Sequence, residues 1–266
     1  MKTPYILIVA LCISLLSCQT NKQDKSEGLL ETTAVNDVGQ NSTKTDQLII
    51  HPISHATMVL TYGEDNIYID PTGGANAFKE LSEPDIVLIT DIHGDHMDLN
   101  TLRALDLSRT TVIAPKAVIE KLPNDILIKT PIILQNGDSL TVNGYSIKAV
   151  PMYNLREDAL KFHSKGRGNG YVLNIAGERI YISGDTEDIP EMRALKNIDK
   201  AFVCMNLPYT MTVENAANAV LEFKPKQVYP YHYRGTEGFS DVNTFKRLVN
   251  RSNTSIEVVQ LNWYKS

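Results

Sequence analysis

Residues 90–98, which read TDIHGDHMD, constrain the fold and chemistry of this chain more than any other stretch. They carry three aspartates and two histidines, and they directly follow residues 85–89, DIVLI, a β-branched apolar run that predicts a buried strand. Side chains at such a strand end can converge on one point, and imidazole together with carboxylate suits zinc, manganese or iron. The alternative is a polar turn with two surface histidines, which does not explain so dense a cluster of ligand groups.

Length and composition exclude some classes of protein. The chain has 266 residues, enough for one large domain or two small ones, with 42% hydrophobic and 21% charged residues. Its net charge of -5 and the lack of a basic stripe argue against nucleic acid as a partner.

The N-terminus is predicted to lie outside the folded domain. Residues 5–16 form an apolar run of the length of a signal-peptide core, and residues 15–18, LLSC, resemble the end of a bacterial lipoprotein signal. This resemblance implies cleavage before Cys18 and a lipid anchor on Cys18 in the bacterial cell envelope, without indicating which membrane. An ordinary secretory signal with an incidental cysteine is the alternative.

Three segments are therefore expected: a lipoprotein signal peptide at 1–18, a flexible polar tether at 19–46 and one domain at 47–266. Cys204 is then the single cysteine of the domain, so no intrachain disulfide is possible, and its apolar neighbours favour a core position.

The pattern of the domain predicts many strands first and helix–strand alternation later. Two mixed sheets packed together, with helices outside, fit this order. Asn-Gly pairs at 136–137 and 143–144 predict two hairpins. Residues 63–70 and 177–185 resemble each other: in both, a strand after a tight turn delivers an aspartate, Asp70 or Asp185, near its end.

The 91–96 motif, the SGDT segment at 183–186 and His232 after an apolar strand resemble the metallo-β-lactamase superfamily, from about residue 51 to the C-terminus. Residues 54–57 (SHAT), Asp70 before proline and the YHY at 231–233 look most like its small metal-dependent hydrolases of the ascorbate-lactonase and N-acyl-phosphatidylethanolamine phospholipase D types.

The resemblance implies an α/β (α+β) fold, a four-layer αββα sandwich of two mixed sheets, with two divalent metal ions, most often zinc, at one edge of the sheets. One ion would be bound by Asp91, His93 and His163, and the other by Asp95, His96 and His232, with Asp185 between them.

The sequence departs from the family pattern in two places. The motif usually begins with histidine, whereas Asp91 is a shorter and harder oxygen donor. Asp91 either shifts the preference towards manganese or iron or does not reach the ion, in which case that site is weak or empty. The third metal-binding histidine of the family follows soon after a strand that ends in proline, where this chain has residues 151–154, PMYN. We expect His163, later in the chain, to bind the ion instead, with Asn154 as the alternative.

Other candidates surround this set. His55 and Asp70 are expected to orient metal-binding imidazoles, although local turn hydrogen bonds would also explain them. Lys165, Arg167 and Tyr233 are candidates for substrate binding, with solvated surface positions as the alternative. Trp263 is expected in the core.

These features predict a metal-dependent hydrolase that uses a metal-bound hydroxide on an ester, lactone, amide or phosphodiester bond. Asp95 is expected to take part in proton transfer if only one metal is present. The expected partners are a small-molecule or lipid-like substrate and, through the anchor, a membrane. The alternatives are a non-catalytic metal- or ligand-binding envelope lipoprotein and, with a di-iron centre, an oxidoreductase.

Overall fold

The computed structural model describes residues 47–264. The signal peptide, the tether and the lipidation of Cys18 lie outside these residues and stay predictions. Among the described residues, no helix has both the length and the apolar composition needed to cross a membrane.

The first sheet begins with antiparallel strands and continues with parallel ones, in chain order. Its strands are β1 (Ile49–Ser54), β2 (Thr57–Tyr62), β3 (Asp65–Ile69), β4 (Ile86–Leu88), β5 (Thr111–Ala114) and β6 (Thr130–Ile133). The carboxyl ends of the parallel strands β3 and β4 therefore lie at the same edge of this sheet.

The second sheet has the order β15-β12-β11-β10-β9-β8-β7, antiparallel from β7 to β10 and parallel from β10 to β15. Its strands are β7 (Ser139–Val142), β8 (Tyr145–Met152), β9 (Gly168–Ile175), β10 (Glu178–Ile182), β11 (Lys200–Cys204), β12 (Gln227–Tyr231) and β15 (Glu257–Val258). A small hairpin of β13 (Arg234–Gly235) and β14 (Gly238–Phe239) follows β12.

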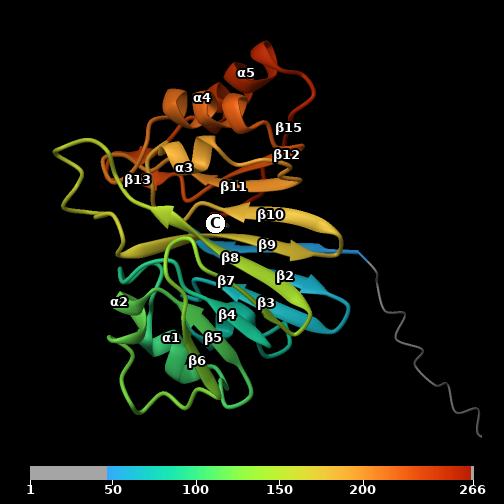
Figure 1. Cartoon of the computed structure of the whole chain (residues 1–266), viewed down its shortest axis with the longest axis vertical. Coiled ribbons are helices and arrows are strands. Elements are labelled where there is room, and N and C mark those ends of the chain that lie inside the picture. Colours follow the sequence, from blue (N-terminus) through green and yellow to red (C-terminus); the bar gives the residue numbers. More distant parts are fainter. Residues whose placement is uncertain (1–46, 265–266) are drawn as a thin grey trace, which may run out of the picture. The chain divides into compact units, whose positions relative to one another are not determined.

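Helices cover the outer faces of the sheets (Figure 1). Those beside the first sheet are α1 (Leu99–Ala104) and α2 (Lys116–Ile119), and those beside the second sheet are α3 (Pro190–Arg193), α4 (Val213–Phe223) and α5 (Val242–Ser252). A short 3-10 helix, η1 (Ala75–Phe78), lies between β3 and β4. The expected α/β sandwich of two mixed sheets with outer helices is confirmed.

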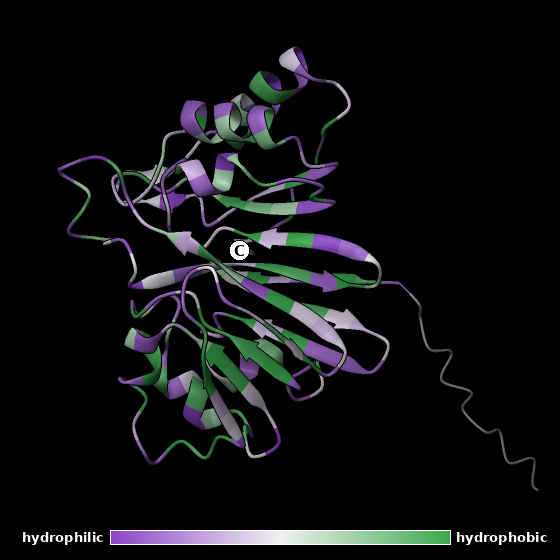
Figure 2. Cartoon of the chain, viewed as in Figure 1, coloured by the Kyte–Doolittle hydropathy of each residue, from purple (hydrophilic) through white to green (hydrophobic). Residues whose placement is uncertain are grey.

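Alternation along the strands explains why both faces of the first sheet are covered. In β3, Ile67 and Ile69 belong to the large cluster between the sheets, whereas Tyr68 belongs to the cluster under α1 and α2. Because successive side chains of a strand point to opposite faces, a run of apolar residues buries both. Figure 2 shows hydrophobic stretches along many of the strands, whereas the helices carry both hydrophobic and hydrophilic segments.

One of the two predicted hairpins is wrong. Residues 143–144 do join antiparallel strands, β7 and β8, with both residues in the left-handed region. Residues 136–137 instead connect β6, in the first sheet, to β7, in the second. The Asn136 side chain donates to the Gly168 carbonyl at 2.8 Å and to the Asn169 side chain at 2.6 Å, so it fastens this crossing to β9.

Trp263 follows β15 and is fully buried, with its ring against Phe202 and Tyr231. We expect Trp263→Ala to lower the free energy of unfolding by about 3–5 kcal/mol, because a large cavity opens beside Phe202 and Tyr231. Trp263→Phe, which keeps most of the volume, should cost clearly less. Urea unfolding followed by circular dichroism measures both, and equal losses for the two variants would contradict a packing role.

Candidate metal centre

The candidate residues lie at strand ends on one edge of the two sheets. Asp70 follows β3, and the 91–96 motif follows β4. Asp185 follows β10, and His232 follows β12. His55 lies in the turn between β1 and β2. Its backbone carbonyl accepts a hydrogen bond from the backbone NH of His232, which links the two turns. The structure therefore brings together residues that lie far apart in the sequence, such as His55 and His232, which are 177 residues apart.

His96, Asp185 and His232 form a fully buried group of donors that could hold an ion. The His232 Nε2 atom lies 3.1 Å from His96 Nε2 and 3.2 Å from Asp185 Oδ1, and His96 Nε2 lies 3.5 Å from Asp185 Oδ2. Two ligands of a tetrahedral zinc ion with bonds of about 2.0–2.1 Å lie about 3.3 Å apart. The spacing of these buried donors therefore fits a shared ion.

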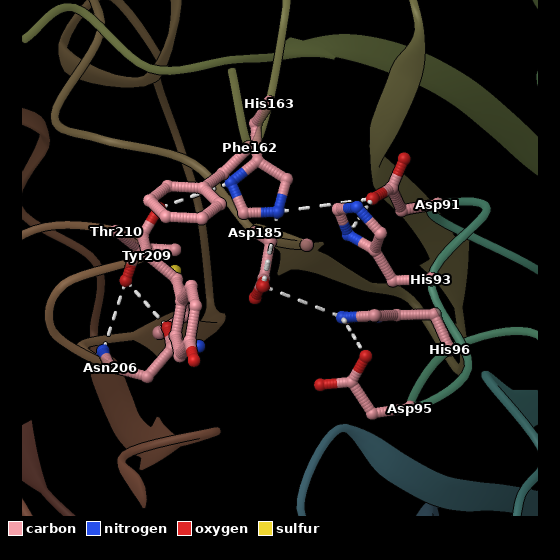
Figure 3. A network of polar contacts seen from close by, with 12 residues as sticks. Asp91, His93, Asp95, His96, Phe162, His163, Asp185, Asn206, Tyr209 and Thr210 are labelled. Carbon is pink, nitrogen blue, oxygen red and sulfur yellow. Dashed lines mark hydrogen bonds and ion pairs between the residues drawn. The ribbon is translucent and has the colours of Figure 1, made fainter. Parts of the chain in front are cut away.

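Asp95 adds a second carboxylate to this group. Its Oδ2 atom lies 3.4 Å from His232 Nε2, and its Oδ1 atom lies 3.9 Å from His96 Nε2. Figure 3 shows the Asp95 and Asp185 carboxylates on either side of the His96 ring nitrogen. Asp95, His96, Asp185 and His232 together offer two oxygens and two nitrogens, a set that zinc, manganese and iron accept.

Asp70 fixes the orientation of His96. Its carboxylate accepts hydrogen bonds from the Thr90 backbone NH at 2.7 Å, the Thr90 hydroxyl at 2.7 Å and His96 Nδ1 at 2.8 Å. A carboxylate can only accept, so His96 Nδ1 donates its proton to Asp70. Nε2 then faces Asp95, Asp185 and His232, where it would bind an ion in exchange for its own proton. This is the geometry expected of Asp70 from its place at a strand end.

Asp185 is held by a turn that requires glycine. Gly184 has φ of 60°, and a Cβ atom there would lie 2.5 Å from the Met152 sulfur. Burial disfavours the charged form of Asp185, but the nearby charges of His232 and His96 outweigh burial and hold its pKa well below the usual value. Burial also opposes ionisation of Asp95, and hydrogen bonds from His232 and His55 lower its pKa below the usual value. Both carboxylates are therefore ionised at neutral pH.

His55 contacts this group directly. Its Nε2 atom lies 3.3 Å from Asp95 Oδ2, and its ring packs against His232 with centroids 3.8 Å apart. Burial lowers the pKa of His55, so its ring is neutral at pH 7. The Nδ1 atom lies 2.7 Å from the Tyr264 hydroxyl, which itself accepts the Arg234 backbone NH at 3.2 Å. Tyr264 therefore donates to His55, and His55 Nε2 donates to Asp95.

Asp91, His93 and His163 form a separate group. His163 Nδ1 donates to the Tyr209 carbonyl at 3.1 Å, which leaves the Nε2 lone pair towards Asp185 Oδ2 at 3.3 Å. His163 Nε2 is buried without a hydrogen-bond partner, as expected of an atom aimed at a ligand. The Asn154 side chain lies on the other side of this ring, 3.2 Å from Nδ1, so the structure places His163 and not Asn154 at the site.

Three predicted substrate-binding residues have other contacts. Lys165 pairs with Glu191 at 2.9 Å and lies over the Tyr153 ring, with most of its side chain exposed. Arg167 binds Asp91, and Tyr233 packs against Tyr264 and Phe239. None of the three lines the pocket at the metal centre.

The pocket beside the metal centre measures about 270 Å³ and is lined by residues of both donor groups and of two loops. Its lining is His93, Asp95, Phe162, His163, Asp185, Asn206 and Tyr209. Phe162, Asn206 and Tyr209 were not predicted. Asn206 follows the end of β11 by two residues, and the carboxyl ends of parallel strands meet at one edge, so its position was available as a signal in the sequence.

Cys204 lies in the core, as expected. Burial raises the pKa of its thiol to about 12, so the thiolate is absent at neutral pH. Its sulfur donates to the Thr186 carbonyl.

We expect Asp70→Asn to weaken metal binding by about 10–100-fold, because an amide in place of the carboxylate no longer fixes the His96 tautomer. Isothermal titration of the metal-free protein with Zn²⁺ measures this change. Asp98→Asn is a matched control, since the Asp98 carboxylate caps α1 by accepting from Asn100 and Thr101. Equal affinities for Asp70→Asn and the unchanged chain would show that Asp70 does not orient a ligand.

Comparison with known proteins agrees with this geometry. A family model described as a beta-lactamase superfamily domain matches residues 50–232. Over 209 residues the chain is 32% identical to a UPF0173 metal-dependent hydrolase from Thermococcus onnurineus, a match that covers 74% of this chain and 90% of the relative.

Two solved structures are similar as well. One is described as a metal-dependent hydrolase from Parabacteroides distasonis, with a TM-score of 0.73 and 39% identity over 82% of this chain and 94% of that one. The other is a metallo hydrolase from Ignicoccus hospitalis, with a TM-score of 0.67 over 80% of this chain and 94% of that one; at 21% identity it shows a likeness of fold. This chain therefore belongs to the beta-lactamase superfamily, whose metallo-β-lactamase members its motifs resemble.

Proposed function

We propose that this chain is a metal-dependent hydrolase that cleaves a neutral ester, lactone or amide bond in a small molecule. The observation that carries the proposal is the convergence of Asp95, His96, Asp185 and His232, whose donor spacing fits an ion. The relatives from Thermococcus onnurineus and Parabacteroides distasonis, which are both described as metal-dependent hydrolases, support it.

Zinc fits these donors best, because two imidazoles and two carboxylates suit tetrahedral coordination. Manganese and iron accept the same set. A divalent ion held there polarises the substrate oxygen and lowers the pKa of water towards about 7. The expectation of two ions stays a prediction, since the donors of the second group have other partners.

The pocket favours a neutral substrate bond. Among residues 47–264, no lysine or arginine lines it. Lys165 pairs with Glu191, and Arg167 pairs with Asp91. Asp95 and Asp185 together offset the charge of one divalent ion, so an anionic phosphodiester would meet no net positive charge at this site. We therefore prefer a carbonyl substrate to the phosphodiester.

Residues of the chain can place the substrate and orient a water molecule. Asn206 Oδ1 accepts from the Thr210 hydroxyl at 2.6 Å, which orients the amide so that its Nδ2 can donate to a substrate oxygen in the pocket. Asp95 is ionised, partly exposed and in contact with His55 Nε2. Asp95 can therefore orient a water molecule by accepting a hydrogen bond from it, and the His55–Tyr264 pair stabilises the position of Asp95.

We also propose that the enzyme acts in the bacterial cell envelope, held at Cys18 by a lipid anchor. The signal-like residues 1–18 and the polar residues 19–46 support this location. A substrate that is small or lipid-like would be within reach of such an anchored domain.

A substrate panel tests the reaction. We expect turnover of a p-nitrophenyl ester, a γ-lactone or a p-nitroanilide, and at least about tenfold less of bis-p-nitrophenyl phosphate, as an unfavourable charge costs about 1.4 kcal/mol or more. Dialysis against a chelator should abolish turnover, and added Zn²⁺ or Mn²⁺ should restore it. Turnover that survives removal of the metal, or that is found for the phosphodiester alone, would overturn the proposal.

Asn206→Leu should lower kcat by about 10²–10³-fold if the amide stabilises negative charge on the substrate oxygen, with little change in KM. Metal content and circular dichroism should match the unchanged chain. Phe162→Leu is the matched control, because it keeps an apolar side chain at the pocket wall. A rise in KM without a fall in kcat would assign Asn206 to binding alone.

A further inference from the structure

Arg167 donates hydrogen bonds to both carboxylate oxygens of Asp91, so neither oxygen is free to bind an ion. The Arg167 Nε atom donates to Asp91 Oδ1 at 3.0 Å and its Nη2 atom donates to Asp91 Oδ2 at 2.8 Å. Nη2 also contacts the Phe162 carbonyl, so the guanidinium is fixed from two sides. Such bidentate pairs of arginine and carboxylate are among the strongest charged hydrogen bonds in proteins.

The donor spacing in this group differs from that in the group of His96, Asp185 and His232. Asp91 Oδ2 lies 2.7 Å from His93 Nδ1, a hydrogen-bond distance and well below the spacing of about 3.3 Å for two ligands of one tetrahedral ion. Asp91 Oδ2 therefore accepts from both His93 and Arg167. An ion at Asp91 would have to displace at least one of these donors.

Charge separates the two groups in the same direction. Asp95 and Asp185 bring two negative charges to the first group, which match a divalent cation. At the second group the negative charge of the buried Asp91 is already offset by Arg167, and His93 and His163 add none when neutral. Asp185, 3.3 Å from His163 Nε2, is shared with the first group. The Arg167 guanidinium would repel a second divalent ion at the second group, and solvent screens this repulsion only weakly because Asp91 is buried.

We propose that this chain holds one metal ion, at Asp95, His96, Asp185 and His232, and that the Asp91–Arg167 ion pair takes the place of the second ion. The inference rests on the proposed metal centre but not on any particular substrate. His93 and His163, which line the pocket, then present ring nitrogens to the substrate instead of to an ion.

Metal stoichiometry tests this inference without any activity assay. The full chain is dialysed to equilibrium against excess Zn²⁺, and bound zinc is measured by elemental analysis. We expect one ion per chain for the unchanged protein. Two ions per chain in the unchanged protein would overturn the proposal, whether or not the chain hydrolyses any substrate of the panel.

The double variant Asp91→His, Arg167→Met removes both charges of the pair together and supplies a third imidazole beside His93 and His163. We expect its zinc content to double. With Mn²⁺ it should give the coupled electron paramagnetic resonance spectrum of two ions about 3.5–4 Å apart, which the unchanged chain should lack. An unaltered zinc content in the folded double variant would show that the ion pair is not what excludes the second ion.

Two controls separate the ion pair from general effects. Lys165→Met removes a cation two residues away in the same loop and should leave the content at one ion. Asp91→Asn with Arg167→Met removes the pair without adding an imidazole and should also bind one ion. If the Asp91→His, Arg167→Met variant does not fold, the stoichiometry of the unchanged chain still decides the question.

Discussion

The buried carboxylate of Asp70 is the contact that holds together the residues of the candidate metal centre. Its side chain is fully buried and accepts three hydrogen bonds, two from Thr90 and one from His96, while its backbone carbonyl accepts from Thr57. A buried carboxylate without hydrogen-bond partners would destabilise the fold by several kcal/mol. This cost keeps the Thr90 and His96 donors in place beside Asp70. The end of β3 thereby fixes the start of the 90–98 segment and the His96 ring.

The site beyond Asp70 divides into two halves that differ in net charge. Asp185 touches both, through His163 on one side and through His96 and His232 on the other. The half with Asp95 retains its negative charge for a cation, whereas the half with Asp91 is neutralised within the protein by Arg167. Asp91 and Arg167 are therefore parts of one arrangement, since removal of Arg167 alone would leave the buried Asp91 carboxylate without its cation.

The sequence predicted the layers and the strand-end positions well, because both follow from local patterns. Alternating or continuous apolar runs specify strands, and polar residues directly after them, such as Asp70 and Asp185, must lie at a sheet edge. The hairpin at 136–137 was wrong because an Asn-Gly turn signal does not say which sheet the next strand joins. The ion pairs of Lys165 and Arg167 could not be predicted from the sequence, because only the fold brings Glu191 and Asp91 next to them.

His163 shows why spacing alone could not place the third imidazole. Its loop begins after β8 and is fastened by Glu187, a buried carboxylate that accepts from the backbone NH groups of Leu155 and Arg156 and from the Arg156 side chain. Glu187 lies two residues after Asp185, so the turn that supplies the shared carboxylate also holds the loop that supplies His163. The position of that ring is thus set by an acid that carries no metal-binding pattern, and a longer or shorter loop could deliver the same imidazole provided that this anchor remained.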